Sequence, residues 1–408
     1  MESQLDRLRA LLAAITPANL FYAPRLAAAG VTASIGSLEE FCARMPFTMK
    51  GDLVADQAAN PPYGSNLTFP LERYSRFCQT SGTSGRALVI LDDNDSWDWM
   101  LGNWARIYRA AALAPGDRIY FAFSFGPFLG FWTAFESAAK LGFLCIPGGG
   151  LGTAARLRAL IEHRATALCC TPTYALHLAE VARQEGIDLR AASVRTIIVA
   201  GEPGGSVPEV RAKISSEWNG ARLIDHYGMT EVGPVAYQEP AGEALLHVIE
   251  ESYFAEIIDP RGNTAAAAGE IGELVLTTLG RVGAPLLRYR TGDLVRRSAE
   301  SPGFALAGGI LGRADDMIVV RGVNLFPAGV DAVVRTIPGI SEYRVEVSRR
   351  GALVEMLVTI ESPGDESARS LEAALTGAFS LRIPVRRVEP GTLPRFELKA
   401  RRWSVRDI

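Results

Sequence analysis

Apolar segments and helical segments alternate regularly between residues 119 and 227, and this alternation limits the possible folds more than any other feature. Short apolar runs are separated by stretches with helical periodicity, notably 153–164 and 174–185. Continuous apolar runs that alternate with helices are typical of parallel strands buried on both faces. We therefore expect an α/β fold with a largely parallel sheet. Its strand candidates are 119–123, 143–146, 167–170, 196–200 and 222–224.

Polar segments follow two of these predicted strands, at the edge of a parallel sheet where ligands usually bind. One segment spans residues 200–203 (AGEP) and the other spans 226–231 (HYGMTE). In the second, Tyr227 offers a flat ring for a base, Thr230 a hydroxyl for a phosphate, and Glu231 an oxygen ligand suited to Mg²⁺. Each residue also has an ordinary interpretation, as a turn residue or a solvated charge. Their occurrence together in one loop favours a nucleotide site.

A second candidate phosphate site lies earlier, in residues 78–86 (CQTSGTSGR). Glycine lets a loop approach a ligand closely, so N–H groups and hydroxyls of such a loop can surround phosphate oxygens. The Gly-Lys-Ser/Thr ending of a Walker loop is absent. A flexible surface loop explains the same composition, and both interpretations stay open at this point.

The segment 312–327 (GRADDMIVVRGVNLFP) has the pattern of a joint between two domains. It passes two carboxylates, enters a short β-branched strand at 318–320 and breaks at a glycine and a proline. An acidic turn before an ordinary strand is the alternative. Beyond it, strand-like sequence at 341–360 and a helical stretch at 371–379 predict a small α+β domain. Before it, Asp293 could accept ribose hydroxyls or simply cap a turn.

Lysine is rare in this chain, which makes the position of Lys399 informative. Lysine occurs only at positions 50, 140, 213 and 399, and arginine supplies the rest of the 42 basic residues. A lysine inside the arginine-rich segment 395–402 indicates a need for a compact ammonium on a flexible stem. Chance retention is the alternative.

Composition excludes several classes of protein. A net charge of −3 and a pI near 6.0 give no reason to expect a nucleic-acid partner. The five cysteines are scattered without a Cys-x-x-Cys spacing, which predicts reduced thiols and a cytoplasmic location. The longest uncharged run, 119–135, is interrupted by glycine and proline and is too short to span a bilayer. Residues 1–9 mix acids and bases, unlike a signal peptide.

The separate motifs occur in an order and spacing that resembles the adenylate-forming superfamily. Within it the sequence is similar to the phenylacetate-CoA ligase branch, through residues 315–327, residues 45–50 (MPFTMK) and Leu393-Pro394-Arg395 with Lys399. The resemblance covers the chain nearly from end to end. It rests on the motifs at 80–86, 200–203, 227–231, 289–294, 312–327 and 394–402.

The resemblance implies two domains: a large ATP- and acid-binding domain over 1–312 and a small mobile domain over 313–408. Asp315 would be the hinge between them. The implied catalytic residues are Lys399, Thr230, Glu231 and Arg313. The implied nucleotide-binding residues are Thr80, Ser81, Gly82, Thr83, Ser84, Gly85, Gly201, Glu202, Pro203, Tyr227, Gly228, Met229, Thr230, Asp293 and Arg313.

Individual contacts with ATP follow from the same resemblance. Residues 80–85 would hold the pyrophosphate-side phosphates, while residues 201–203 and Tyr227 would frame adenine. Asp293 would take the ribose hydroxyls, with Arg313 nearby on ribose or phosphate. ATP, Mg²⁺ and coenzyme A are the implied cofactors, and a carrier-protein phosphopantetheine is the alternative to coenzyme A.

The physics of acid activation fits these implied roles. A carboxylate that attacks a phosphate meets charge repulsion, so fixed cations and donors must gather around the α-phosphorus. Lys399 and a Mg²⁺ on Glu231 would supply this charge, and Thr230 would contact the α-phosphate. A thiol must then attack the acyl-adenylate from a direction that Lys399 obstructs. Rotation of the small domain about Asp315 would move the lysine away and open a path for pantetheine.

The sequence departs from the usual family pattern in two places. In the candidate phosphate loop, Ser84, Arg86 and Ala87 stand where threonine, lysine and proline are common, so a side-chain contact weakens while the backbone cradle is retained. Some relatives hold a structural metal through cysteines after the Tyr-Gly motif. Residues 232–260 contain no cysteine and one histidine, His247, and we therefore expect no zinc.

Aromatic side chains at 123–132 lie where relatives line the acid pocket, and the resembling branch favours aryl or arylacetic acids. Phe123, Phe125 and Phe128 are the candidate walls for a planar ring, with the backbones of Gly201 and Gly228 opposite. Ordinary core packing accounts for at least half of the cluster.

The sequence thus predicts an ATP-dependent ligase that converts an aromatic acid into its adenylate and then into a coenzyme A thioester. A stand-alone enzyme that loads an acyl or aryl carrier protein, or that adenylates a deazaflavin, is the alternative within enzymes. A catalytically silent nucleotide-binding protein is the alternative outside them, although Glu231 and Lys399 argue against silence. The oligomeric state stays open, with a homodimer as one option.

Overall fold

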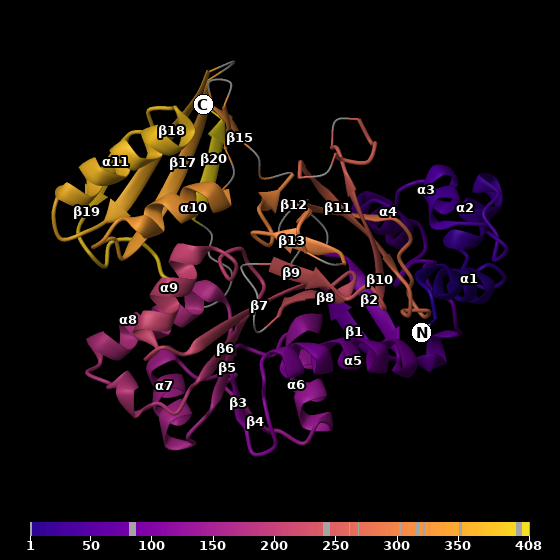
Figure 1. Cartoon of the computed structure of the whole chain (residues 1–408), viewed down its shortest axis with the longest axis horizontal. Coiled ribbons are helices and arrows are strands. Elements are labelled where there is room, and N and C mark those ends of the chain that lie inside the picture. The colour runs from indigo at the N-terminus through magenta and orange to yellow at the C-terminus, as the bar shows by residue number, and fades with distance from the viewer. Residues whose placement is uncertain are drawn as a thin grey trace.

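The computed structural model has a large domain and a smaller C-terminal domain that lies against one end of it (Figure 1). The structure describes residues 2–80, 87–239, 245–260, 262–267, 269–301, 303–314, 316, 318–320, 323–325, 327–350, 353–396 and 402–407.

The largest sheet is the predicted parallel α/β core. Its strands are β3 (Arg118–Phe121), β4 (Leu144–Pro147), β5 (Ala167–Cys170), β6 (Thr196–Val199), β7 (Arg222–Met229), β8 (Gly233–Gln238), β9 (Leu245–Val248) and β13 (Ala305–Ala307). They lie in the order β13-β9-β8-β7-β6-β5-β3-β4, and β4, β3, β5, β6 and β7 run parallel. The predicted parallel α/β sheet is therefore confirmed.

Helices cover both faces of this sheet, which is why its strands read as continuous apolar runs. On β3, Ile119 and Phe121 face a cluster that includes Trp104, whereas Tyr120 faces a separate cluster that includes Trp218. Figure 1 shows the helices packed along the sheet. They are α5 (Asn94–Ala110), α6 (Leu129–Lys140), α7 (Thr153–Glu162), α8 (Pro172–Gln184), the 3₁₀ turn η2 (Leu189–Ala191) and α9 (Pro208–Glu217).

The N-terminal helices pack with two further sheets around a core that contains Leu8, Leu12, Tyr253 and Leu276. Helix α1 (Gln4–Ile15) starts at Ser3, whose side chain accepts a hydrogen bond from the backbone of Asp6. The other elements of this region are α2 (Tyr22–Ala29), α3 (Leu38–Arg44), α4 (Lys50–Ala59), η1 (Leu71–Arg73), β1 (Tyr74–Gln79), β2 (Val89–Asp93), β10 (Tyr253–Ile258), β11 (Ile271–Thr278), β12 (Tyr289–Arg296) and β14 (Gly312–Arg313). Strand β1 pairs with β2, and the second sheet has the order β10-β11-β12-β14.

The C-terminal domain has the predicted α+β composition. Its sheet has the order β19-β18-β17-β20, and a buried cluster that includes Val345, Val358 and Leu371 packs beneath its helices. Its elements are β15 (Ile318–Val320), β16 (Val323–Leu325), α10 (Pro327–Thr336), β17 (Glu342–Arg350), β18 (Leu353–Glu361), α11 (Glu366–Phe379), β19 (Val385–Val388) and β20 (Trp403–Asp407).

Two segments that we expected to be turns are instead strands. Strand β7 pairs in parallel with β6 only as far as Asp225, and it then continues to Met229 as the antiparallel partner of β8. Tyr227 and Gly228 therefore lie in a hairpin strand rather than in a loop. Asp293 lies within β12, where it pairs with Arg313 of β14, rather than in a turn. In both places the backbone forms hydrogen bonds with an adjacent strand, and the sequence of a single segment does not predict that pairing.

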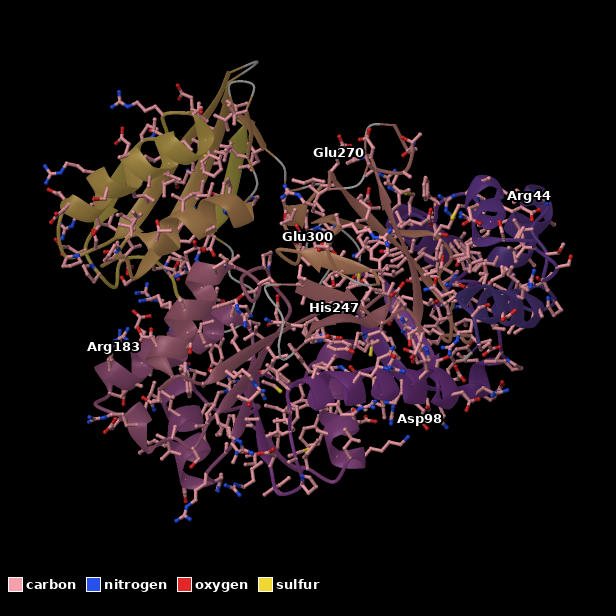
Figure 2. All side chains as sticks on the ribbon, in the orientation of Figure 1. Arg44, Asp98, Arg183, His247, Glu270 and Glu300 are labelled. Carbon is pink, nitrogen blue, oxygen red and sulfur yellow. The ribbon has the colours of Figure 1, made fainter. Side chains whose placement is uncertain are left out.

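Exposed charged side chains include Arg44, Asp98, Glu270 and Glu300, which are labelled in Figure 2. Among the helices of the described residues, none is long and apolar enough to cross a bilayer.

A fully buried ion pair joins β2 to the loop that follows β11. Arg281 donates from Nε and Nη2 to the two carboxylate oxygens of Asp92 at 2.7 and 2.6 Å, and both side chains are 0% exposed. The same guanidinium donates from Nη1 to the carbonyl of Glu231 at 2.5 Å. One buried cation therefore connects three segments that are distant in sequence.

We expect Asp92→Asn to lower the free energy of unfolding by about 3–5 kcal/mol, because Arg281 would keep its charge in the interior without a counter-charge. Urea unfolding followed by circular dichroism measures the change. The matched control is Asp98→Asn, since Asp98 forms an exposed pair with Lys140 at 2.8 Å and should contribute less than about 1 kcal/mol. Equal stability of the two variants would contradict the assigned role of the buried pair.

Candidate active site

Tyr227, Asp293 and Arg313 form a hydrogen-bonded cluster between the eight-stranded sheet and the β10-β11-β12-β14 sheet. The Tyr227 hydroxyl donates to Asp293 Oδ2 at 2.6 Å, and Arg313 Nη1 lies 3.3 Å from Asp293 Oδ1. Burial, together with the Asp293 carboxylate, holds the pKa of Tyr227 well above its usual value, so the phenol stays a donor. The structure thus brings together three predicted nucleotide-binding residues from β7, β12 and β14.

Glu231 is buried next to this cluster and carries a contact that sequence reasoning missed. Its Oε1 lies 3.0 Å from the ammonium of Lys50 at the start of α4, and 3.4 Å from the donating hydroxyl of Tyr289. Lys50 is one of the four lysines of the chain, and this rarity is the signal that could have identified it. The predicted ligand of Mg²⁺ therefore already faces a cation.

The chemistry of this donor set fits Mg²⁺. Mg²⁺ usually takes one or two carboxylates from a protein and completes its octahedron with substrate phosphates and waters. A single buried carboxylate, with a lysine in the place of the counter-cation, matches that pattern. Within the described parts of the chain, no group of three or more His, Cys, Asp and Glu side chains gathers at one point.

The backbone between Tyr227 and Glu231 is tightly constrained. A Cβ on Gly228 would lie 2.8 Å from the carbonyl oxygen of Gly233, so only glycine fits there. The Met229 sulfur lies 3.6 Å from the Tyr227 hydroxyl, and Thr230 follows, half-buried, at the turn into β8. The hairpin therefore presents these residues in a fixed register.

Residues 201–203 follow β6, as predicted. The carboxylate of Glu202 in this segment is hydrogen-bonded to a helix. Glu202 accepts hydrogen bonds from the backbone N–H and the hydroxyl of Thr173, in the first turn of α8. Gly201 adopts a left-handed φ of +91°, and Gly201 and Pro203 are exposed. Glu202 thus fixes the loop onto α8, while the neighbouring backbone stays open to a ligand.

Thr80 closes the base of the predicted phosphate loop. Its N–H donates to the carbonyl of Leu88, and its hydroxyl accepts from the Leu88 N–H, both at 3.0 Å. The other predicted members of this loop, the hinge and the catalytic lysine lie outside the described residues. These are Ser81, Gly82, Thr83, Ser84, Gly85, Asp315 and Lys399.

The predicted acid-pocket phenylalanines belong to one aromatic cluster at the start of α6. The Phe123 ring stacks on Phe131 with centroids 4.2 Å apart, and Phe128 meets Phe131 edge-on at 5.9 Å. Phe123 is buried, whereas Phe125 and Phe128 are half-buried. A Cβ built on Gly201 would meet Thr171 at 3.7 Å, and one built on Gly228 would first meet Gly233, Pro234 and His226, so the nearest atoms around both positions belong to residues other than these rings.

Comparison with known proteins adds an independent line of evidence. A family model described as "AMP-binding enzyme" matches residues 75–280, and one described as "AMP-binding enzyme C-terminal domain" matches residues 322–406. The phenylacetate-coenzyme A ligase of Pseudomonas putida is 33% identical over 370 residues, which cover 88% of this chain and 81% of that protein. The corresponding ligase of Escherichia coli strain K12 is 32% identical over 387 residues, covering 90% and 85%.

A solved structure is also similar over nearly the whole chain. A 2-hydroxyisobutyryl-CoA ligase in the postadenylation state, in complex with an acyl-AMP, has a TM-score of 0.93 at 29% identity, covering 99% of this chain and 89% of that one. The same enzyme in the thioesterification state has a TM-score of 0.74 over the same coverage. This chain is therefore more similar overall to the postadenylation structure of that enzyme than to its thioesterification structure.

Two buried titratable residues precede Tyr227 on β7 and have opposite pKa shifts. Burial raises the pKa of Asp225 to about 6, although the Ser206 hydroxyl donates to it at 2.5 Å. Burial lowers the pKa of His226 to about 4. Between about pH 4 and pH 6, Asp225 is protonated in the folded state but ionised in the unfolded state, whereas His226 is neutral in the folded state but protonated in the unfolded state. As pH rises, Asp225 therefore lowers the free energy of unfolding and His226 raises it.

We expect Asp225→Asn to remove the opposing effect of Asp225, so that the rise in stability with pH that is due to His226 can be measured. The stability of the variant minus that of the natural protein should increase by up to about 3 kcal/mol as pH rises from 4 to 6.5, because only the natural protein must ionise a buried carboxyl. Chemical unfolding at a series of pH values measures this difference. A difference that does not change with pH would contradict the raised pKa, whatever its constant value.

Proposed function

Because the chain belongs to the AMP-binding enzyme family and is an AMP-forming acyl-CoA ligase similar to phenylacetate-CoA ligases, we propose that it activates an aryl or arylacetic acid. The observation that carries this proposal is the Tyr227–Asp293–Arg313 cluster beside the buried carboxylate of Glu231. This cluster combines acceptors for a ribose with cations for phosphate.

In the proposed first step, an oxygen of the substrate carboxylate attacks the α-phosphorus of ATP. A new P–O bond forms, the bond to pyrophosphate breaks, and acyl-AMP remains bound. Asp293 accepts the ribose hydroxyls, Arg313 lies beside ribose and phosphate, and Thr230 contacts the α-phosphate. Lys399 brings its ammonium to the attacking carboxylate and the α-phosphate, where negative charge accumulates.

Glu231 is the proposed ligand of Mg²⁺, which would neutralise the phosphates that leave. Lys50 holds the Glu231 carboxylate in place through its 3.0 Å contact. When ATP and the metal bind, the Lys50 ammonium moves from Glu231 to a phosphate oxygen, because the flexible lysine side chain can reach either anion.

In the proposed second step, the thiolate of coenzyme A attacks the acyl carbon. A C–S bond forms, the C–O bond to AMP breaks, and AMP leaves. The two domains, 1–312 and 313–408, turn about Asp315 between the steps, which withdraws Lys399 from the path of the thiol.

The aromatic acid is supported by the phenylacetate-CoA ligases at 32–33% identity and by the half-buried rings of Phe125 and Phe128. The similar 2-hydroxyisobutyryl-CoA ligase makes a small branched acid the competing substrate class. Acid-dependent exchange of labelled pyrophosphate into ATP tests both, with phenylacetate, benzoate, 2-hydroxyisobutyrate and acetate. Preference for the two aromatic acids is the expected result, and preference for either aliphatic acid would overturn the substrate class.

The acceptor is tested separately, with the acid that supports exchange. We expect thioester formation on coenzyme A and none on a holo carrier protein, and the reverse result would replace coenzyme A as the acceptor.

We expect Lys399→Ala to reduce the exchange reaction by about 10²-fold or more, since a preorganised cation at the reacting phosphate is lost. Thioester formation from a supplied acyl-adenylate should stay within a few-fold of the natural enzyme. Lys140→Ala is the matched control, because Lys140 pairs with Asp98 on the surface of α5 and α6, and it should change neither step. If Lys399→Ala reduced both steps equally, Lys399 would not act specifically in adenylation and the proposed role would be wrong.

A further inference from the structure

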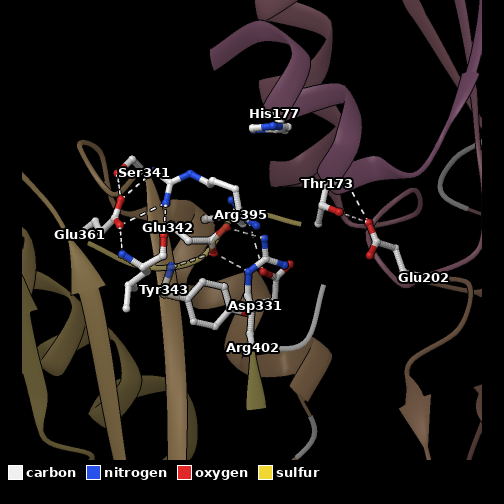
Figure 3. A network of polar contacts seen from close by, with 12 residues as sticks. Thr173, His177, Glu202, Asp331, Ser341, Glu342, Tyr343, Glu361, Arg395 and Arg402 are labelled. Carbon is white, nitrogen blue, oxygen red and sulfur yellow. Dashed lines mark hydrogen bonds and ion pairs between the residues drawn. The ribbon is translucent and has the colours of Figure 1, made fainter. Parts of the chain in front are cut away.

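Arg395 binds a carboxylate on each of the two domains, Glu361 and Glu180. Figure 3 shows Arg395 with Glu361 in the small domain. Within the small domain, Nη1 and Nη2 donate to the two carboxylate oxygens of Glu361 at 3.1 and 2.7 Å. Toward the large domain, Nε and Nη2 donate to the two oxygens of Glu180 on α8 at 3.2 and 2.9 Å. Two-point contacts of this kind fix direction as well as distance. The guanidinium therefore joins the end of β18 to α8 in one defined orientation.

The cross-domain pair is largely removed from water. Arg395 and Glu180 are 24% and 19% exposed, at the edge of an interdomain cleft of about 230 Å³. Burial raises the pKa of Glu180, but hydrogen bonds from His177 and Arg395 outweigh it and bring the pKa to about 2. Glu180 is thus ionised whenever the two domains are in contact at neutral pH.

The pair can open without leaving an isolated charge. If the small domain moves away, Arg395 keeps Glu361, whose side chain is 0% exposed and also accepts from the Ser341 hydroxyl at 2.9 Å. Glu180 stays 3.5 Å from His177 Nδ1, one turn earlier on α8, which can pair with the carboxylate when the imidazole is protonated. Because an unpaired buried charge is the main cost of breaking an ion pair, these second partners make the contact reversible.

Helix α8 connects this contact to the nucleotide site. Thr173, in the first turn of α8, holds Glu202 of the loop proposed to frame adenine, and Glu180 lies two turns further along the same helix. Figure 3 shows Thr173 bonded to Glu202 of the neighbouring loop, and His177 further along the helix on the side of Arg395. The small domain therefore docks on the element that also carries the nucleotide loop.

Arg395 and Arg402 hold the two flanks of the segment that contains Lys399. Arg402 donates from Nε and Nη2 to Glu342 at 2.5 and 3.1 Å, within the small domain. Lys399 follows Arg395 by four positions, so its backbone lies at most about 14 Å from that of Arg395. Docking of Arg395 on Glu180 therefore limits where Lys399 can be placed.

We propose that Arg395 and Glu180 are positioning residues for the adenylation step, and that their cross-domain ion pair selects the arrangement in which Lys399 is delivered to the α-phosphate. This inference rests on the role of Lys399 in the proposed function. It agrees with the overall similarity of the chain to the 2-hydroxyisobutyryl-CoA ligase, which has a TM-score of 0.93 for the postadenylation state and 0.74 for the thioesterification state. Release of the pair accompanies the turn of the small domain toward thioester formation.

The test measures both steps in the full-length Glu180→Gln variant, which removes the charge and keeps the shape. We expect adenylation, followed by pyrophosphate exchange, to fall about fivefold to tenfold, while thioester formation from a supplied acyl-adenylate stays unchanged. Arg395→Gln should likewise slow adenylation and leave thioester formation unchanged. The double variant should be no slower than Arg395→Gln alone, because both changes remove one contact.

Glu217→Gln is the matched control. Glu217 lines the same cleft but pairs with Arg183 and Lys213, both within the large domain, so its loss should change neither step. Figure 2 shows Arg183 on the large domain. Normal adenylation in Glu180→Gln, equal loss of both steps, or additive losses in the double variant would each overturn the inference.

A substrate-free measurement separates this inference from the proposed function. Small-angle X-ray scattering of the ligand-free chain should give a larger radius of gyration for Glu180→Gln than for the natural protein or Glu217→Gln. If Lys399→Ala keeps adenylation while this expansion occurs, the role of Lys399 fails and the docking contact stands. If Lys399→Ala abolishes adenylation and Glu180→Gln neither expands nor slows it, the docking contact fails alone.

Discussion

The arrangement of the site depends on a guanidinium that no solvent reaches. Arg281 is held by both oxygens of Asp92 on β2, and its remaining face supports the carbonyl of Glu231. A charge in such surroundings is stable only when its partners surround it completely. The hairpin that carries Tyr227, the loop after β11 and strand β2 therefore form one unit, and the carboxylate of Glu231 inherits its position from that unit.

Positions fixed by local chemistry could be predicted from the sequence. The apolar runs of β5 and β6 and the helical stretch of α7 were placed nearly at their true limits, because burial on both faces and helical periodicity leave clear patterns. Tyr227 and Asp293 were both expected at the nucleotide site for separate reasons, and the structure brings them into contact, although their expected setting in turns was wrong. Hairpin pairing extended both segments into strands, and such pairing depends on chain segments that a local pattern does not include.

Contacts between segments far apart in sequence could not be predicted in the same way. Lys50 and Glu231 are separated by most of the large domain, as are Glu180 and Arg395 by much of the chain. Each residue has an ordinary surface pattern in its own segment, and only the fold brings the charges together. The rarity of lysine pointed to position 50 as well as to 399, but no local feature tied it to a carboxylate. The complete site is thus a property of the topology as well as of the motifs.

The two sides of the proposed acid pocket, Gly228 and the aromatic rings, differ in how far their side chains can change during evolution. A side chain at this position would collide with the carbonyl of Gly233, so one wall of the region is closed to variation. The rings of Phe125 and Phe128, by contrast, rest on neighbours across the cluster and keep part of their surface free. Libraries intended to redirect the enzyme toward new acids should therefore sample these two aromatic positions and leave the glycine unchanged.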